Sequence, residues 1–151
     1  MSTTHGIGNA GEFYVLAQLA QRGYIAAKTD DGQTLIDVIC TNPDTLQSVN
    51  IQVKTTTYKN NSKRWLMSKK NERDHDSLWY VLIELGNADE RPDFYVFHSS
   101  VVGPAVAEDH STWISEPKAN GEPRKDTSMR QFWPTDDQLA GAKEAWSTLF
   151  S

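Results

Sequence analysis

The stretch that decides the fold is VNIQVKTTT, which runs from Val49 to Thr57. Apolar and polar side chains alternate strictly over its first positions, and this period of two predicts a β-strand with one apolar and one polar face. The polar face consists of Asn50, Gln52 and Lys54. The strand therefore presents amides next to an amine, and the residues that lie opposite them decide what this face can do.

A second apolar stretch, LIDVIC, precedes this strand and contains a single polar residue, Asp37. The mostly polar segment TNPDTLQS separates the two stretches and suits the loop of an antiparallel hairpin. Their apolar faces coincide when Cys40 lies opposite Val49. In that register Asp37 lies directly opposite Gln52, and Lys54 is its diagonal neighbour, within reach of a long side chain. We therefore expect an acid, an amide and an amine on one face of a hairpin.

Residues 10–22, before the hairpin, are predicted to form a helix that ends at Gly23. Asn9 and Glu12 have the spacing of a capping box at its start. Glu12 also falls near the middle of the apolar face of the helix, beside Leu16, which is an unusual place for a carboxylate. Two interpretations follow: the carboxylate caps the helix by reaching back to Asn9, or it points towards the hairpin.

The rest of the chain is predicted to continue as strands and helices. Strands are expected at 24–28, 35–40, 49–57, 77–85 and 93–98, and helices at 10–22, at 66–73, in part of 100–114 and after Thr135. The order α-β-β-β-α-β-β-α predicts an α/β domain with one mixed sheet flanked by helices, in which 77–85 is buried on both faces. Residues 116–131 lack apolar periodicity and are expected to form a flexible loop. We expect a single domain over residues 1–151.

The segment from Gly6 to Gly11, GIGNAG, matches the G-x-G-x-x-G pattern of dinucleotide-binding loops. Such a loop follows a buried strand, whereas the short segment before Gly6 contains no convincing strand former. We therefore expect no nucleotide cofactor, and we interpret the glycines as flexible entry and close packing at the start of a helix.

The overall composition is that of a globular domain. Of the 151 residues, 38% are apolar and 23% charged, and the formal net charge is −5. The chain has no apolar run long enough to span a membrane, and its N-terminus lacks the pattern of a secretory signal. The single cysteine, Cys40, excludes an internal disulfide and a cysteine-rich zinc site. These features predict a cytoplasmic protein with no membrane partner.

Positive charge is concentrated after the polar strand. Seven of the fifteen basic residues lie between Lys54 and Arg73, with one acid, Glu72, among them. Such a block can hold phosphates locally, although the net charge argues against wholesale nucleic-acid binding. The candidate nucleic-acid-binding residues are Lys59, Asn60, Asn61, Lys63, Arg64, Lys69, Lys70 and Arg73. A solvated loop and helix face is the alternative interpretation.

The residues expected around the hairpin suit a divalent metal ion. The carboxylates of Glu12 and Asp37, the amide oxygen of Gln52 and a nearby backbone carbonyl are hard oxygen ligands of the kind that Mg²⁺ and Mn²⁺ prefer. Lys54 beside such a site can position or deprotonate a water molecule, and can stabilise charge that develops on phosphorus. Metal-assisted phosphodiester hydrolysis requires these parts.

The segment from Gly8 to Thr57 resembles the core of the PD-(D/E)xK nuclease superfamily, most closely the branch with a Q-x-K element found in Mrr-like restriction endonucleases and relatives of archaeal Holliday-junction resolvases. The resemblance implies a restriction-endonuclease-like fold, Mg²⁺- or Mn²⁺-dependent cleavage of DNA, and a homodimer with one active site for each strand. It also implies roles for individual residues. Glu12, Asp37, Gln52 and the Val53 carbonyl would bind the metal, and Lys54 would serve the attacking water.

One residue departs from the commoner pattern of this superfamily. Many members carry an acid at the position of Gln52, so the resemblance predicts weaker metal binding in this chain. The competing hypothesis is therefore a nuclease-fold module without catalysis, which binds nucleic acid or a protein partner. Taken singly, Asp37 could be a buried hydrogen-bonded acid, and Gln52 and Lys54 an ordinary exposed strand face.

Overall fold

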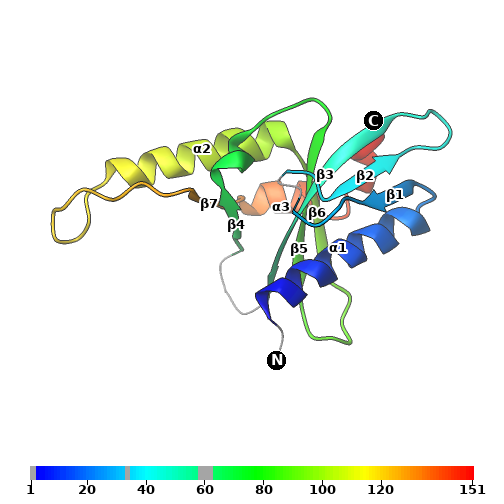
Figure 1. Ribbon diagram of the computed structural model, residues 1–151, viewed down its shortest axis with the longest axis horizontal. Coiled ribbons are helices and arrows are strands. Elements are labelled where there is room, and N and C mark those ends of the chain that lie inside the picture. Colours follow the sequence, from blue (N-terminus) through cyan, green and yellow to red (C-terminus); the bar gives the residue numbers. More distant parts are fainter. Residues whose placement is uncertain (1–2, 33–34, 58–62) are drawn as a thin grey trace.

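The computed structural model describes residues 3–32, 35–57 and 63–151. It contains a five-stranded mixed sheet in the order β1-β2-β3-β5-β6 and a two-stranded sheet of β4 and β7 (Figure 1). The elements are α1 (Thr4–Gln21), β1 (Ile25–Lys28), β2 (Val38–Thr41), β3 (Ser48–Thr57), β4 (Trp65–Ser68), the 3-10 helix η1 (Lys69–Glu72), β5 (Leu78–Leu85), β6 (Asp93–His98), α2 (Ser99–Ser115), β7 (Met129–Phe132), α3 (Asp136–Ala142) and the 3-10 helix η2 (Trp146–Phe150). The predicted α/β class is confirmed. No helix in these ranges is long and apolar enough to cross a membrane.

The predicted hairpin is present. β2 runs antiparallel to β3 with Cys40 opposite Val49, which is the register expected from the apolar faces. β2 begins at Val38, later than predicted, so that Asp37 precedes the strand. The backbone N–H of Asp37 still donates to the oxygen of Ile51 (2.8 Å), whereas the backbone N–H of Val53 is accepted by the carboxylate of Asp37 (2.8 Å) and not by a main-chain carbonyl.

β5 is an interior strand of the larger sheet and is buried on both faces, as predicted. It lies between β3, to which it is parallel, and β6, to which it is antiparallel. Val81 faces a core closed by α1 and η2, whereas Leu82 faces a second core closed by α2, α3 and the small sheet. Gln52 and Lys54 of β3 lie beside Tyr80 and Leu82 of β5. The polar face of the hairpin therefore belongs to the side of the sheet that carries the second core.

The prediction of a short basic helix at 66–73 is wrong. Trp65–Ser68 form β4, and only Lys69–Glu72 are helical. β4 pairs with β7, with Trp65 opposite Phe132, and both of these aromatic side chains are buried. Because its partner strand comes from near the other end of the chain, no local pattern shows β4. β7 begins at Met129, so the predicted loop at 116–131 ends at residue 128.

α2 runs without the interruption that Gly103-Pro104 was expected to cause. Pro104 lies beyond the first turn of the helix, so it removes the hydrogen bond that an N–H at this position would donate to the carbonyl of Ser100, but the helix continues past it. A Cβ atom at position 103 would lie 2.7 Å from the backbone oxygen of Glu72. The glycine thus allows α2 to pack directly on η1, and this tertiary contact stabilises a helix that the local sequence disfavours.

The C-terminal helix starts where the sequence predicts but ends early. The Thr135 side chain caps α3, and Gln138 completes the capping box. The helix stops at Ala142, and the chain then passes to η2. Leu139 consequently packs in the core on the α2 side, whereas Trp146 packs in the core on the α1 side.

α1 begins earlier than predicted. Thr3 is its N-cap, and the hydroxyl of Thr3 accepts a hydrogen bond from the backbone N–H of Gly6 (3.0 Å). Asn9 therefore lies inside the helix, and the predicted capping box between Asn9 and Glu12 does not form. The glycine-rich segment is helical throughout, which agrees with its interpretation as a helix start.

Gly11 allows α1 to approach the sheet closely. A Cβ atom at position 11 would lie 2.0 Å from Oγ1 of Thr55, whereas nothing lies within 4 Å of a Cβ atom at Gly8 in the same helix. We expect Gly11→Ala to lower the free energy of unfolding by about 1–3 kcal/mol through overpacking. Gly8→Ala is the matched control and should raise it by about 0.5–1 kcal/mol. Urea unfolding measures both, and equal responses of the two variants would contradict this packing.

Candidate active site

The point where β2 begins brings together Asp37, Gln52, Val53 and Lys54. Oδ2 of Asp37 accepts two hydrogen bonds, from Nε2 of Gln52 at 2.6 Å and from the backbone N–H of Val53 at 2.8 Å. Lys54 interacts electrostatically with the same carboxylate. The acid, the amide and the amine expected on this face of the hairpin are therefore neighbours.

Oxygen atoms without hydrogen-bond donors gather at this point. Gln52 is 5% exposed, and within the described ranges its Oε1 is buried without a partner. Oδ1 of Asp37 likewise accepts no hydrogen bond from the described part of the chain. The carbonyl of Val53 leaves β3 on the same edge as its N–H, and it accepts a long hydrogen bond from Nε2 of Gln52 at 3.4 Å. A buried unpaired acceptor costs about 1–3 kcal/mol, which a bound cation would offset.

Glu12 approaches the same point from α1. Its Oε2 lies 3.4 Å from Nζ of Lys28, which also contacts Oδ1 of Asp31 at 2.7 Å. Burial raises the pKa of the Glu12 carboxyl and the negative charge of Asp37 raises it further, whereas Lys28 lowers it. The two carboxylates are thus close enough to interact. Glu12 lies beside the buried face of α1 and not at its middle as predicted, because the helix turns Gly11 towards the sheet.

Lys28 is a site residue that the sequence reasoning missed. It is the last residue of β1 and lies opposite Val38 of β2. The pairing of these two strands brings its ammonium group to the carboxylates of Glu12 and Asp37. The signal in the sequence was weak, because a lysine just before a turn is an ordinary surface residue.

Opposing charges balance one another at Asp37 and Lys54. Burial raises the pKa of the Asp37 carboxyl, while the hydrogen bond from Val53 and the positive charges of Lys54 and Lys70 lower it. Burial lowers the pKa of the Lys54 ammonium group; Lys70 lowers it further, and Asp37 opposes both effects. Lys54 therefore loses its proton more readily than an exposed lysine, which is a property that general-base catalysis requires.

η1 carries Lys70 towards the site and is itself anchored to the sheet. Asn71 is fully buried; its Nδ2 donates to the hydroxyl of Tyr80 (3.0 Å), and its Oδ1 accepts the backbone N–H of Ser68 (2.8 Å). Tyr80 lies next to Gln52 across the β3–β5 pair. Sequence reasoning missed this link, because a single tyrosine in a buried strand indicates only a core residue.

The predicted nucleic-acid-binding residues separate into distinct groups. Lys59, Asn60 and Asn61 lie outside the described residues. Lys63 is held within the fold, since its Nζ lies 3.1 Å from the hydroxyl of Tyr95 and 3.5 Å from Oε1 of the buried Glu84. The structure therefore gives Lys63 an internal partner at the edge of the second core.

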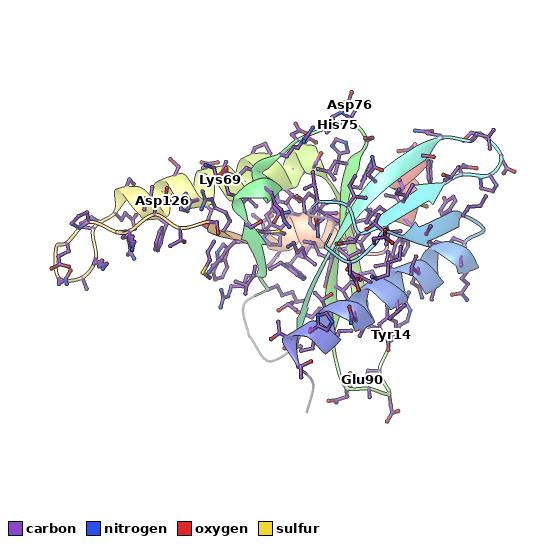
Figure 2. All side chains as sticks on the ribbon, in the orientation of Figure 1. Tyr14, Lys69, His75, Asp76, Glu90 and Asp126 are labelled. Carbon is purple, nitrogen blue, oxygen red and sulfur yellow. The ribbon has the colours of Figure 1, made fainter. Side chains whose placement is uncertain are left out.

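Lys69, Lys70 and Arg73 are exposed on η1 and immediately after it. Lys70 is close enough to the candidate site to interact with Asp37, and Figure 2 shows Lys69 on the same short helix beside α2. Arg64 lies over the ring of Trp133. The basic residues of η1 are therefore the predicted group that borders the site.

The oxygen atoms at this point fit a hard divalent cation. No group of three or more His, Cys, Asp and Glu side chains gathers in the ranges that the structure describes. A metal here would thus depend on amide and main-chain oxygens in addition to the carboxylates of Glu12 and Asp37. The buried, unpartnered Oε1 of Gln52 is an oxygen of this kind, and Mg²⁺ and Mn²⁺ accept such ligands.

Known structures share this fold. No protein-family model matches the sequence, and no curated protein matches it. The chain is similar to a bacterial homing endonuclease, with a TM-score of 0.58 and 16% identity over 99% of this chain and 92% of the other. It is also similar to a Holliday junction resolvase from the archaeal hyperthermophile Archaeoglobus fulgidus, with a TM-score of 0.51 and 10% identity over 94% of each chain. These similarities confirm the predicted restriction-endonuclease-like fold, and at such identities they concern the fold alone.

Asp37→Asn tests the electrostatics of the site. Asparagine keeps an oxygen that can accept both hydrogen bonds now made to Oδ2. Folding raises the pKa of this carboxyl, so the wild-type protein loses stability as the pH rises from about 4 through the folded-state pKa. The variant does not lose this stability. With metal chelated by EDTA, we expect its Tm to exceed that of the wild type by a few degrees at neutral pH, and by less in acid.

Asp44→Asn, in the exposed loop between β2 and β3, is the matched control for this measurement. The Tm of this variant should follow that of the wild type across the pH range, because Asp44 is an exposed loop residue and not one of the site carboxylates. Calorimetric scans between acid and neutral pH provide the comparison. A difference between Asp37→Asn and the wild type that did not grow with pH would refute the assignment of a buried charge to Asp37.

Proposed function

We propose that this chain is a metal-dependent endonuclease that hydrolyses phosphodiester bonds in DNA. The observation that carries the proposal is the buried, unpartnered Oε1 of Gln52 beside Asp37. Lys54, whose pKa is lowered by burial, follows two positions later. The likeness to a homing endonuclease and to a Holliday junction resolvase supports the proposal, because both proteins are nucleases with this fold.

The metal ligands in this proposal are the side chains of Glu12, Asp37 and Gln52 and the carbonyl of Val53. A bound Mg²⁺ or Mn²⁺ ion would supply Lewis-acid activation of the phosphodiester. Lys28 now contacts Glu12 at 3.4 Å and Asp31 at 2.7 Å. Because the contact with Asp31 is the shorter one, Lys28 keeps a partner when Glu12 turns to a cation.

Lys54 acts as the general base in this mechanism. Its neutral amine accepts a proton from a water molecule, whose oxygen attacks phosphorus while the bond from phosphorus to the leaving strand oxygen breaks. The resulting ammonium group compensates for negative charge on the phosphate. Lys70 lowers the pKa of Lys54 and so increases the fraction of neutral amine available near neutral pH.

The exposed basic residues Lys69, Lys70 and Arg73 would hold the phosphates of DNA next to the site. Their local charge permits this although the net charge of the chain is −5. A homodimer would present one such site to each strand of a duplex. The proposed partners are therefore DNA and a second copy of the chain.

Lys54→Met tests the role of the base. Methionine retains the length and apolar stem of the side chain, so we expect the fold and Mn²⁺ binding to persist while DNA cleavage falls about 10²- to 10⁴-fold. Cleavage of plasmid, branched and single-stranded DNA in Mg²⁺ or Mn²⁺ provides the measurement. Lys143→Met is the matched control, because Lys143 pairs with Asp93 away from the site (3.6 Å). Equal cleavage by wild type and Lys54→Met would indicate a contaminating nuclease.

Gln52→Glu tests the metal site independently of cleavage. The substitution adds a ligand charge and removes the donor to Asp37, so the metal-free variant should have a lower Tm than the wild type. Mn²⁺ should bind about tenfold more tightly, because the charge of the ligands tunes affinity. Calorimetric titration measures the affinity. Asn50→Asp, on the same face of β3, is the control and should leave it unchanged. Mn²⁺ affinity unaltered by Gln52→Glu would remove Gln52 from the ligand set.

An inactive nuclease-fold module that binds nucleic acid or a protein partner is the second candidate function. Two observations favour it, the amide at Gln52 in place of an acid and the negative net charge. The two candidates differ in one result. The inactive module would show no cleavage in Mg²⁺ or Mn²⁺ in the wild type, and Lys54→Met would then change nothing.

A further inference from the structure

A groove lies between the C-terminal half of α2 and β7. Its residues are distant in the sequence from those of the candidate active site. We call it the aromatic groove; it has a volume of about 620 Å³ and its lining includes Asp109, His110, Trp113, Met129, Gln131 and Trp133. Such a volume lies within the range of sites that bind small organic groups. In Figure 1, α2 and the segment that leads back to β7 extend together away from the larger sheet.

This returning segment, residues 116–128, is called the arm. His110 on α2 holds it, since Nε2 of His110 lies 2.9 Å from Oδ1 of Asp126, and Figure 2 shows Asp126 on the arm beneath the helix. Arg124 donates to the backbone oxygen of Glu116 (2.9 Å). The arm therefore closes on itself and on α2.

Large apolar side chains remain exposed in the aromatic groove. Trp113 is 40% exposed, Trp133 47% and Met129 63%. Indole rings are usually largely buried, and the other three tryptophans are, with Trp65 and Trp146 in the cores. Two exposed indoles in one groove thus indicate a ligand with flat apolar faces.

An arginine accompanies each of these two indoles. The guanidinium of Arg124 lies 4.9 Å from the ring centre of Trp113, and that of Arg64 lies 5.5 Å from the ring centre of Trp133. An aromatic surface next to a cation favours ligands that combine a π-system with negative charge. Nucleotides have this combination, because each base is flat and each phosphate is anionic.

The aromatic groove is connected to the candidate active site through η1. The backbone N–H of Lys69 donates to the oxygen of Ser128 (2.9 Å), and Arg130 pairs with Glu72 (3.2 Å). The next residue of η1, Lys70, interacts with Asp37 of the site. η1 therefore borders both the candidate active site and the strand that lines the groove, which is the route we infer for a bound DNA strand.

We propose that the aromatic groove binds unpaired nucleobases of the DNA strand whose phosphate lies in the candidate active site. The inference rests on the proposed function, and it names the substrate as DNA with single-stranded bases next to the cleavage point. Bases within a duplex are stacked on one another and offer no free face to Trp113 or Trp133. Asp109 and Gln131 provide polar groups for the edges of such bases.

The test measures binding without cleavage, by fluorescence anisotropy in EDTA. The probes are an oligothymidylate of about 12 nucleotides, the same oligomer with abasic sites, and a fully paired hairpin. We expect Trp113→Ala and Trp133→Ala each to weaken oligothymidylate binding about 5- to 100-fold, with hairpin binding unchanged. The wild type should lose a similar factor on the abasic oligomer. Leu46→Ala is the matched control, because Leu46 is an exposed apolar residue on the β2–β3 loop.

Trp113→Phe and Trp133→Phe keep an aromatic ring and should retain most of the affinity, which separates stacking from misfolding. Oligothymidylate binding that is equal in the wild type and both alanine variants would overturn the proposal, as would equal binding of the abasic oligomer. Those results would leave a protein partner as the occupant of the groove. Failure of the proposed function would give a different result. Base-dependent binding would persist in these assays, but the wild type would not cleave DNA in Mg²⁺.

Discussion

Oδ2 of Asp37 accepts the backbone N–H of Val53 and the side-chain amide of Gln52, and the arrangement of the site depends on this pair of bonds. The carboxylate takes the place of the main-chain acceptor that a longer β2 would offer to the N–H of Val53. The same bonds orient the amide of Gln52 and leave its oxygen buried without a donor. One side chain thus orients the amide of Gln52 and takes the backbone N–H of Val53 at the point where β2 begins.

The cost of this arrangement is electrostatic. Burial disfavours the charged forms of both Asp37 and Lys54, and Glu12 adds a second carboxylate to the same place. Lys28 lowers the pKa of both carboxyls, whereas Lys70 lowers the pKa of Asp37 and also that of Lys54. Groups whose pKa values are shifted by burial and by neighbouring charges cluster at functional sites. A structural hydrogen-bond network would instead satisfy the oxygen of Gln52 and would need no partly buried lysine beside it.

The small sheet of β4 and β7 joins the candidate active site to the aromatic groove. It covers the second core with Trp65 and Phe132, and its strands lead directly into η1 on one side and the arm on the other. Asn71 fixes η1 to Tyr80 of β5, an interior strand of the larger sheet. These links connect the basic residues of η1, the candidate active site and the aromatic groove, which suits the proposed substrate because it would contact all three.

The sequence by itself determined the hairpin and its polar face, because the period of two decides which side of each strand is apolar and the length of the connecting loop selects the register in which Asp37 meets Gln52. It also placed a helix with Glu12 before them and a buried strand at β5. The tertiary structure alone decided the partners: Lys28 reaches the site because β1 pairs with β2, and Lys70 because η1 packs under α2. The pairing of β4 with β7, and with it the aromatic groove, joins segments distant in the chain. Such contacts leave no local periodicity, since each segment alone satisfies the pattern of an ordinary loop or surface helix.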